Sequence, residues 1–208
     1  LYVNASATGD SAVCANSTYS ITANSALANG SQSITITSTD PANNESLQSS
    51  GLSIVVDTIS PATPAVSSQT TNNTSPIING TASLSSGDTL SISVNGASYN
   101  NVAVVNGNWT IDLGTAIADS GTLGIFVDTT YSIEAVITDI AGNTSTDVTS
   151  NELTIDTTAP SVLAVTDMLS ASDTGLYNND NITSSTTPVF AGTCTDTDVV
   201  TVYVDTIA

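Results

Sequence analysis

Two stretches in the second half of the chain decide its organisation: Thr138-Asp139-Ile140-Ala141-Gly142-Asn143-Thr144-Ser145 and Ile155-Asp156-Thr157-Thr158-Ala159-Pro160. Each has a counterpart 99 residues earlier, in Thr39-Asp40-Pro41-Ala42-Asn43-Asn44-Glu45-Ser46 and in Val56-Asp57-Thr58-Ile59-Ser60-Pro61. The separation between the two aspartates is the same in both copies. The shared spacing indicates an internal repeat, which has to be recognised before a fold is assigned.

A third motif follows each of these pairs. Ser75-Pro76-Ile77-Ile78-Asn79-Gly80-Thr81 matches Thr187-Pro188-Val189-Phe190-Ala191-Gly192-Thr193. The second copy reaches this motif 13 residues later than the first, and the additional residues include 172–180. We therefore expect a longer loop in the second copy.

The repeat predicts three segments. Residues 57–155 form one complete unit of 99 residues, residues 1–56 form the back half of another, and residues 156–208 form a front half. The front half would be completed by residues 1–56 of an adjacent copy or period, which gives a second and slightly longer unit. The chain is either one period of a longer array or a protomer whose halves complete each other head to tail. It starts with Leu1 and shows no signal peptide, so we expect a processed chain or a segment of a longer one.

Alternating apolar and polar residues predict strands throughout. The alternation has a period of two in residues 34–37, 90–94, 131–138 and 200–204, and apolar spacing typical of a helix is absent from the sequence. Asn106-Gly107, between two apolar runs, predicts a two-residue hairpin, and Trp109 just after it is expected in the core. About seven short strands in about 100 residues indicate an all-β fold of tandem immunoglobulin-like Greek-key β-sandwiches.

The charge composition excludes several functions. The 208 residues contain no Lys, Arg or His but 19 acidic residues, for a formal net charge of −19. Nucleic acid and anionic membrane surfaces are therefore excluded as direct partners. Catalysis by a Ser-His or Cys-His pair and His-ligated zinc are excluded as well. Apolar residues make up 39% of the chain and the mean hydropathy is +0.18, which is not the composition of a disordered acidic tail.

A hydrolase that uses two carboxylates is the remaining enzyme hypothesis. Aromatic residues make up only 4% of the chain, and no acidic residue is flanked by a cluster of them that could line a sugar site. We therefore expect no enzymatic activity.

The three motifs resemble bacterial immunoglobulin-like repeats of giant secreted adhesins and biofilm-associated surface proteins. The first copy departs from that pattern at Asn43, where the hairpin glycine is expected, and at Ser60. The resemblance implies an extracellular or cell-surface protein that acts as a calcium-rigidified spacer or filament body, with neighbouring copies as head-to-tail partners. The alternative is an adhesin module that recognises a glycan or a surface.

Calcium is the predicted cofactor. Carboxylates without counter-charges attract a cation, and oxygen ligands suit Ca²⁺. The resemblance implies Ca²⁺ at the unit junctions, and the matching residues are Asp40, Asp57, Asp139 and Asp156. The longer loop adds the candidates Asp173, Asn178 and Asp180, whereas Asp112 is expected in mid-strand, facing solvent. The alternative is that these aspartates form turns by accepting hydrogen bonds from local backbone amides.

Two cysteines, Cys14 and Cys194, lie near opposite ends of the chain. If the two half-units belong to one sandwich, both cysteines lie in that unit. A disulfide requires Cα atoms within roughly 7 Å, and an extracellular compartment permits it. We therefore predict a bond between Cys14 and Cys194 of neighbouring copies, with two buried free thiols as the alternative.

Overall fold

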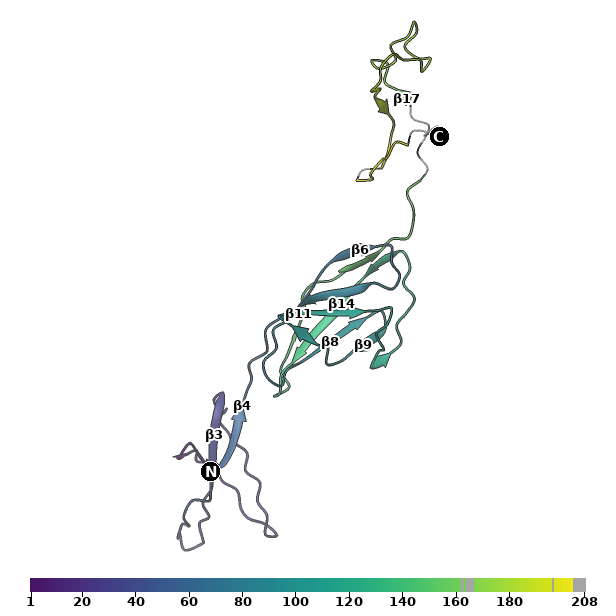
Figure 1. The fold of residues 1–208 in the computed structure, drawn as a ribbon. Coiled ribbons are helices and arrows are strands. Elements are labelled where there is room, and N and C mark those ends of the chain that lie inside the picture. The colour runs from purple at the N-terminus through teal and green to yellow at the C-terminus, as the bar shows by residue number, and fades with distance from the viewer. Residues whose placement is uncertain (162, 164–166, 196, 204–208) are drawn as a thin grey trace. The chain divides into compact units, whose positions relative to one another are not determined.

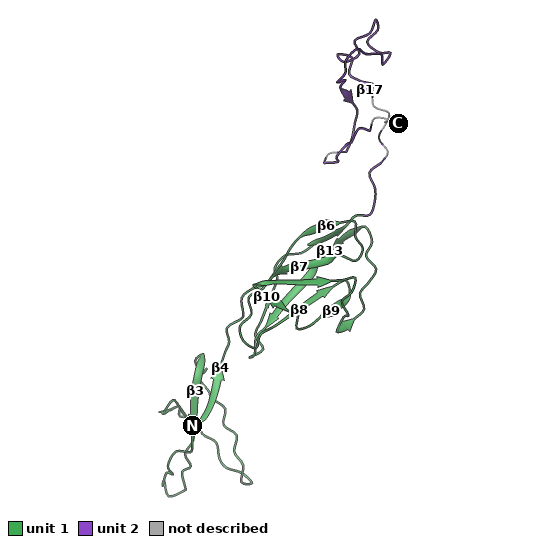
Figure 2. Ribbon diagram, in the orientation of Figure 1, with its two compact units in different colours: residues 1–156 green, residues 157–208 purple. Residues whose placement is uncertain are grey.

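The computed structural model describes residues 1–161, 163, 167–195 and 197–203, and its regular elements are all strands (Figure 1). The chain divides into two units, Leu1–Asp156 and Thr157–Ala208 (Figure 2). Among the residues described, no helix is long and apolar enough to cross a membrane.

A β-sandwich occupies residues 65–155. One sheet has the order β10 (Val104–Val105), β11 (Asn108–Asp112), β7 (Ile77–Thr81), β5 (Ala65–Val66). The other has the order β12 (Ser120–Gly121), β9 (Ala97–Tyr99), β8 (Thr89–Val94), β14 (Ile133–Thr138), β15 (Thr144–Thr146). A three-stranded group, β13 (Thr129–Tyr131), β16 (Leu153–Ile155) and β6 (Gln69–Thr71), includes a parallel pairing of β16 with β6. This is the predicted immunoglobulin-like arrangement of strands.

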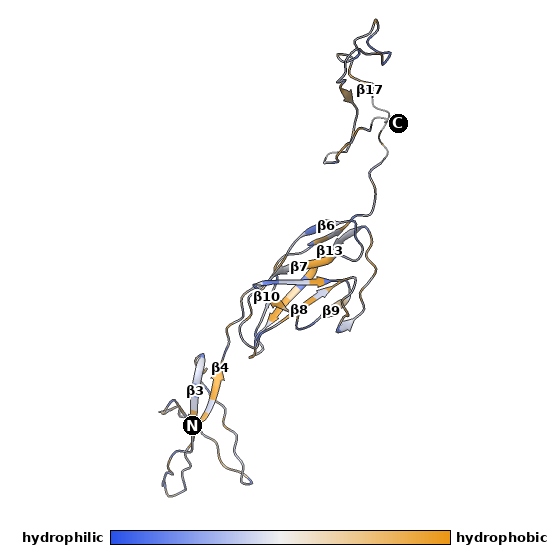
Figure 3. Cartoon of the chain, viewed as in Figure 1, coloured by the Kyte–Doolittle hydropathy of each residue, from blue (hydrophilic) through white to orange (hydrophobic). Residues whose placement is uncertain are grey.

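The predicted alternation determines the core. Leu90, Ile92 and Val94 of β8 are buried, and so are Ile133, Ala135 and Ile137 of the neighbouring β14. Figure 3 shows by colour that hydrophobic residues are concentrated in strands of the sandwich such as β8. The Asn106-Gly107 hairpin is also confirmed, because both residues have positive φ, 52° and 80°, between β10 and β11.

Trp109 explains the glycine of the third motif. The indole is 1% exposed, so Trp109 is a core residue as predicted. It lies opposite Gly80 on the neighbouring strand β7. A Cβ at Gly80 would overlap the carbonyl oxygen of Ala65 and lie 2.6 Å from the indole. Only glycine lets the aromatic ring pack this closely on β7.

Residues 1–56 form a separate sheet with the order β2 (Ser6–Ala7), β1 (Tyr2–Val3), β3 (Gly30–Thr35), β4 (Leu52–Val56). Every member of the buried apolar cluster lies between residues 66 and 155, so this sheet has no apolar core of its own among the described residues. Leu52 and Val55 of β4 are 63% and 73% exposed. Between β2 and β3 the backbone forms only an isolated bridge, between Ala15 and Thr18, and Tyr19 lies outside any strand.

In the unit Thr157–Ala208, β17 (Asp167–Met168) pairs antiparallel with β18 (Phe190–Ala191). The sequence predicts a further strand over residues 200–204. The prediction is wrong for residues 200–203, which form no strand and pair with neither edge of the β17–β18 sheet. Val204, the last residue of this pattern, lies outside the described residues.

Candidate functional site

Asp139 builds the hairpin between β14 and β15. Its Oδ1 accepts hydrogen bonds from the backbone N–H groups of Ala141 (2.9 Å) and Asn143 (2.8 Å), and its Oδ2 accepts one from Asn143 Nδ2 (2.8 Å). Gly142 supplies the left-handed conformation that the turn requires, with φ of 90°. The carboxylate therefore holds the turn of residues 139–143 together.

Asp40 builds the same turn in residues 40–44. Its Oδ1 accepts hydrogen bonds from the N–H groups of Ala42 (2.9 Å) and Asn44 (2.8 Å), and its Oδ2 accepts one from Asn44 Nδ2 (2.8 Å). Asn43 replaces the glycine with φ of 65°. Asparagine is among the few residues that tolerate this region, so the departure from the pattern at this position leaves the geometry unchanged.

These hydrogen bonds shift the pKa of both carboxyl groups in the same direction. The side-chain bond from Asn143 holds the pKa of Asp139 below its ordinary value, with help from backbone donors. The bond from Asn44 lowers the pKa of Asp40 in the same way. In the described residues both aspartates act as turn formers, one of the two roles that the sequence left open.

The Asp139 hairpin also reaches the start of its own unit. Asn143 Nδ2 donates a hydrogen bond of 3.1 Å to the backbone carbonyl of Asp57, and Asp57 Oδ1 accepts one of 3.0 Å from the N–H of Ile59. The residue after Asp57 is held from the other side, because Asn29 Oδ1 accepts bonds from the N–H (3.0 Å) and the hydroxyl (3.1 Å) of Thr58. The structure thus brings Asp57 and the Asp139 turn into one network, the first junction.

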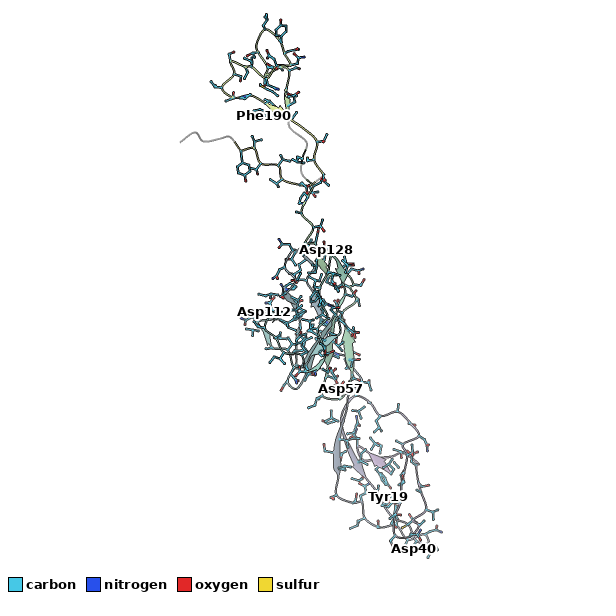
Figure 4. The ribbon with its side chains drawn as sticks, turned by 90° about the vertical axis from the view of Figure 1, so that its right-hand side faces the viewer. Tyr19, Asp40, Asp57, Asp112, Asp128 and Phe190 are labelled. Atoms are coloured by element: carbon cyan, nitrogen blue, oxygen red, sulfur yellow. The ribbon has the colours of Figure 1, made fainter. Side chains whose placement is uncertain are left out.

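Asp156 belongs to a second junction at the other end of the sandwich. Its N–H donates to the carbonyl of Thr71 at 3.0 Å. Asp128 and Asp156 each lie one position beyond the β13–β16 pair Thr129–Ile155. Figure 4 shows Asp57 and Asp128 at opposite ends of the sandwich. Asp128 is not among the residues predicted from the sequence, although its position 99 residues after Asn29 could have identified it.

Asp112 differs from its prediction. It is exposed, as expected, but it is the last residue of β11 and not a mid-strand residue. Its Oδ1 accepts a bond of 2.9 Å from the N–H of Gly114, and its Oδ2 accepts one of 3.0 Å from the hydroxyl of Thr115. Gly114 ends the alternation here, and the aspartate caps the turn that follows.

The longer loop contains a buried carboxylate. Asp173 is 4% exposed; its Oδ2 accepts a hydrogen bond of 3.1 Å from the N–H of Asn181, whereas its buried Oδ1 has no partner. Asp180 forms a local turn with the N–H of Ile182 at 3.1 Å, and Asn178 is exposed. In the described part of the chain, no three His, Cys, Asp or Glu side chains cluster closely enough to hold a metal ion. Calcium ligation by Asp40, Asp57, Asp139, Asp156, Asp173, Asn178 and Asp180 stays a prediction.

The sandwich itself holds one more buried acid, Glu152, which no sequence motif singles out. Its Oε2 accepts a hydrogen bond of 2.9 Å from the N–H of Ile133, and its Oε1 is buried without a partner. A shallow groove that Ile133 also lines has polar walls that include Ser98, Glu134 and Asp147. The described residues that line this groove include no aromatic side chain, so it lacks the platform on which a sugar ring stacks.

Cys14 and Cys194 are both exposed and carry free thiols in the chain. The disulfide between neighbouring copies stays a prediction.

Comparison with known proteins adds one finding. A model of the family described as "Bacterial Ig-like domain" matches residues 63–157 and again residues 159–208. Comparison with curated proteins gives no match. The first match covers the sandwich described above, and the two matches together cover more than half of the chain. The chain therefore belongs to the bacterial Ig-like domain family.

Proposed function

We propose that this chain is a structural spacer: sandwich units joined in series that span distance in an extracellular bacterial surface protein or filament. Its family supplies structural repeat modules of surface proteins. The observation that carries the proposal is the turn that occurs twice, around Asp40 and Asp139, one unit length apart. The same local structure at a constant interval is what a serial array requires.

Catalysis is not part of the proposed function. The carboxylates of Asp139 and Asp112 are engaged in turns, and the single Trp is in the core. In the groove beside Ile133, Asp147 Oδ2 already accepts hydrogen bonds from the N–H and the hydroxyl of Thr149. These carboxylates therefore do not support a function that needs two acids facing a bound sugar.

We further propose that Ca²⁺ binds at the junctions and in the longer loop, and stiffens the array. Two observations support this. The second junction places Asp128 and Asp156 one position beyond a strand pair, and the loop holds the unpartnered Oδ1 of Asp173. Further oxygen ligands would come from backbone carbonyls, amide side chains and water, which Ca²⁺ accepts readily.

Calorimetric titration of the calcium-free chain with CaCl₂ tests this proposal. We expect binding that is weakened by Asp156→Asn for the junction and by Asp173→Asn for the loop, because each change removes a charged ligand and keeps the size of the side chain. Glu134→Gln is the matched control, since Glu134 is an exposed residue of β14 that lies outside the proposed sites. Equal losses for all three variants would mean diffuse attraction to the net charge and would contradict built sites.

A further inference from the structure

The sheet of residues 1–56 repeats part of the sandwich, register for register. The pair Val3–Ser6 corresponds to Val94–Ala97, Val3–Ile34 to Val94–Ile133, and Gly30–Val56 to Thr129–Ile155. The strands β1, β2, β3 and β4 are therefore the equivalents of β8, β9, β13–β14 and β16. A one-residue slip would turn the side chains of a strand to the opposite face, so three matching registers define the equivalence closely.

The equivalent of β16 has an open edge. In the sandwich, β16 pairs on one side with β13 and on the other with β6, in parallel. Its equivalent β4 pairs only with β3 among the described residues. By the 99-residue repeat, the segment equivalent to β6 is 168–170, and its first residue, Met168, is also the last residue of β17.

The apolar residues of the two half-units are also complementary. The hairpin at Ala15–Thr18, with positive φ at Asn16 and Ser17, corresponds to Val105–Asn108, so Tyr19 occupies the position of the core residue Trp109. Tyr19 is nevertheless 58% exposed. The glycine on which such an aromatic packs is Gly80 in the sandwich, and its equivalent, Gly192, lies in the other half-unit.

Phe190 of β18 is the equivalent of Ile78 and completes this comparison. Ile78 is 1% exposed in the sandwich core, whereas Phe190 is 45% exposed (Figure 4). Each half-unit thus exposes the core residues of a sandwich and lacks the residues that would cover them. Exposed apolar groups on sheets with open edges mark an interaction surface.

We propose that residues 1–56 of one copy and residues 167–195 of a second copy of this sequence fold into one sandwich, the seam unit. The inference rests on the proposed function, because it names the partner that joins the units in series. In the seam unit, residues 168–170 pair in parallel with β4, so that Leu169 lies beside Val55, as Thr70 lies beside Thr154. Tyr19 packs on Gly192, and Asn44 bonds the carbonyl of Asp156 as Asn143 bonds that of Asp57.

Cysteine cross-linking of the full chain tests this register. In a background with Cys14→Ser and Cys194→Ser, Val55→Cys with Leu169→Cys places two thiols on opposed strands, within disulfide reach. We expect mild oxidation to convert about half of the chains or more into covalent dimers and longer ladders on non-reducing gels. The matched control is Val55→Cys with Met168→Cys. Its two thiols point to opposite faces of the sheet, so we expect no ladders.

Thr70→Cys with Thr154→Cys is the positive control, because these residues face each other within one sandwich. Failure of this control would contradict the sandwich, and with it the proposed function. The positive control can succeed while Val55→Cys with Leu169→Cys gives no ladders, either in separate chains or in two copies joined head to tail. That result would overturn the seam unit alone. Ladders that need the joined copies would still support it, because joining raises the effective concentration.

Gly192→Ala gives a second measurement that does not use thiols. A methyl group there would displace the Tyr19 ring from the seam unit without touching the sandwich. We expect it to abolish association of separate chains, measured by analytical ultracentrifugation, while the melting temperature of the sandwich stays unchanged. Association at the level of the unmodified chain would contradict the packing of Tyr19 on Gly192.

Discussion

Asp139 acts on stability through the hydrogen bonds that its ionised form accepts. Its pKa is lowered in the folded chain, mainly by Asn143 Nδ2. A lowered folded-state pKa contributes stability above the unfolded value, near 3.9, and that stability is lost as pH falls through the folded value. We expect the melting temperature to be constant from about pH 7 to pH 5 and to decline below about pH 4.

Asp139→Ala removes the acceptors and should lower the melting temperature at pH 7 and flatten its decline in acid. Asp139→Asn is the matched control, because its amide oxygen still accepts the N–H groups of Ala141 and Asn143. A decline in acid that is identical in Asp139→Ala would show that other carboxylates cause it.

Gly80 allows strand β7 to approach both Ala65 and the Trp109 indole closely. Gly80→Ala places a methyl group against Ala65 and Trp109, and we expect it to lower the free energy of unfolding by about 3 kcal/mol. Urea denaturation measures the loss. Gly114→Ala is the control: its Cβ would lie 3.2 Å from Asp112 Oδ1, which belongs to a surface side chain, so the loss should be small. Equal stability of Gly80→Ala and the unmodified chain would contradict the close packing of the indole on β7.

The equivalence of the half-units to the sandwich bears on the predicted disulfide between Cys14 and Cys194. By the hairpin equivalence Cys14 corresponds to Val104 of β10, and by the third motif Cys194 corresponds to Ala82, which follows β7. Strand β11 lies between β10 and β7. Two strand spacings are about 10 Å, farther than a disulfide spans. The alignment therefore favours free thiols over the bond predicted from the sequence.

In copies joined head to tail, we expect both thiols to react slowly with iodoacetamide, and in the single chain we expect them to react within minutes. Mass spectrometry under non-reducing conditions distinguishes this result from the disulfide. A peptide in which Cys14 is bonded to Cys194 would contradict the revised expectation.

At the scale of elements, alternation predicted the strands that are long and face one core. Strands β8 and β14 and the β10–β11 hairpin follow directly from their residues. The change of sheet between β5 and β6 was not predictable, because strands of two or three residues are too short to show a period. The 200–204 pattern predicted a strand that residues 200–203 do not form in this chain, since pairing needs a neighbour that a sequence pattern cannot supply.

The candidate site was predicted in part, for a related reason. Repeat spacing identified Asp40, Asp57, Asp139 and Asp156, and the structure joins Asp57 to the Asp139 turn. The residue that makes this connection, Asn143, is an ordinary turn residue in sequence terms. Its long-range partner is the carbonyl of a residue 86 positions away, and no local pattern encodes such a contact.

Hydrogen exchange should separate the two kinds of sheet. Strands β8, β14 and β16 pack on the apolar core. Among the described residues, no apolar core lies against strands β3 and β4. Exchange of isolated strands approaches that of unfolded chain, because their opening costs little free energy. Mass spectrometry of the single chain should therefore show strong protection in residues 89–94 and 133–138 and weak protection in residues 30–35 and 52–56. Equal protection of both sets would contradict the dependence of β3 and β4 on a second copy.

At the scale of the whole molecule, we expect a mechanical element in which units unfold one at a time. The net charge is −19 and no side chain in the sequence is basic. Neighbouring units therefore repel one another, except where hydrogen bonds or an added cation hold a junction. Serial units of this kind have stabilities that add along the chain. The seam unit makes such a series continuous, since every copy then contributes one half-unit to each of two seam units in addition to its own complete sandwich.

Force-extension measurement on several copies joined head to tail tests this claim most directly. We predict two classes of unfolding event in equal numbers, one from the complete unit 57–155 and one from the longer unit that joins 156–208 to 1–56 of the next copy. At up to about 3.6 Å per residue, the contour length should increase by about 360 Å and about 390 Å, respectively. A record with only the shorter class, in which the remaining residues extend without a force peak, would contradict the account.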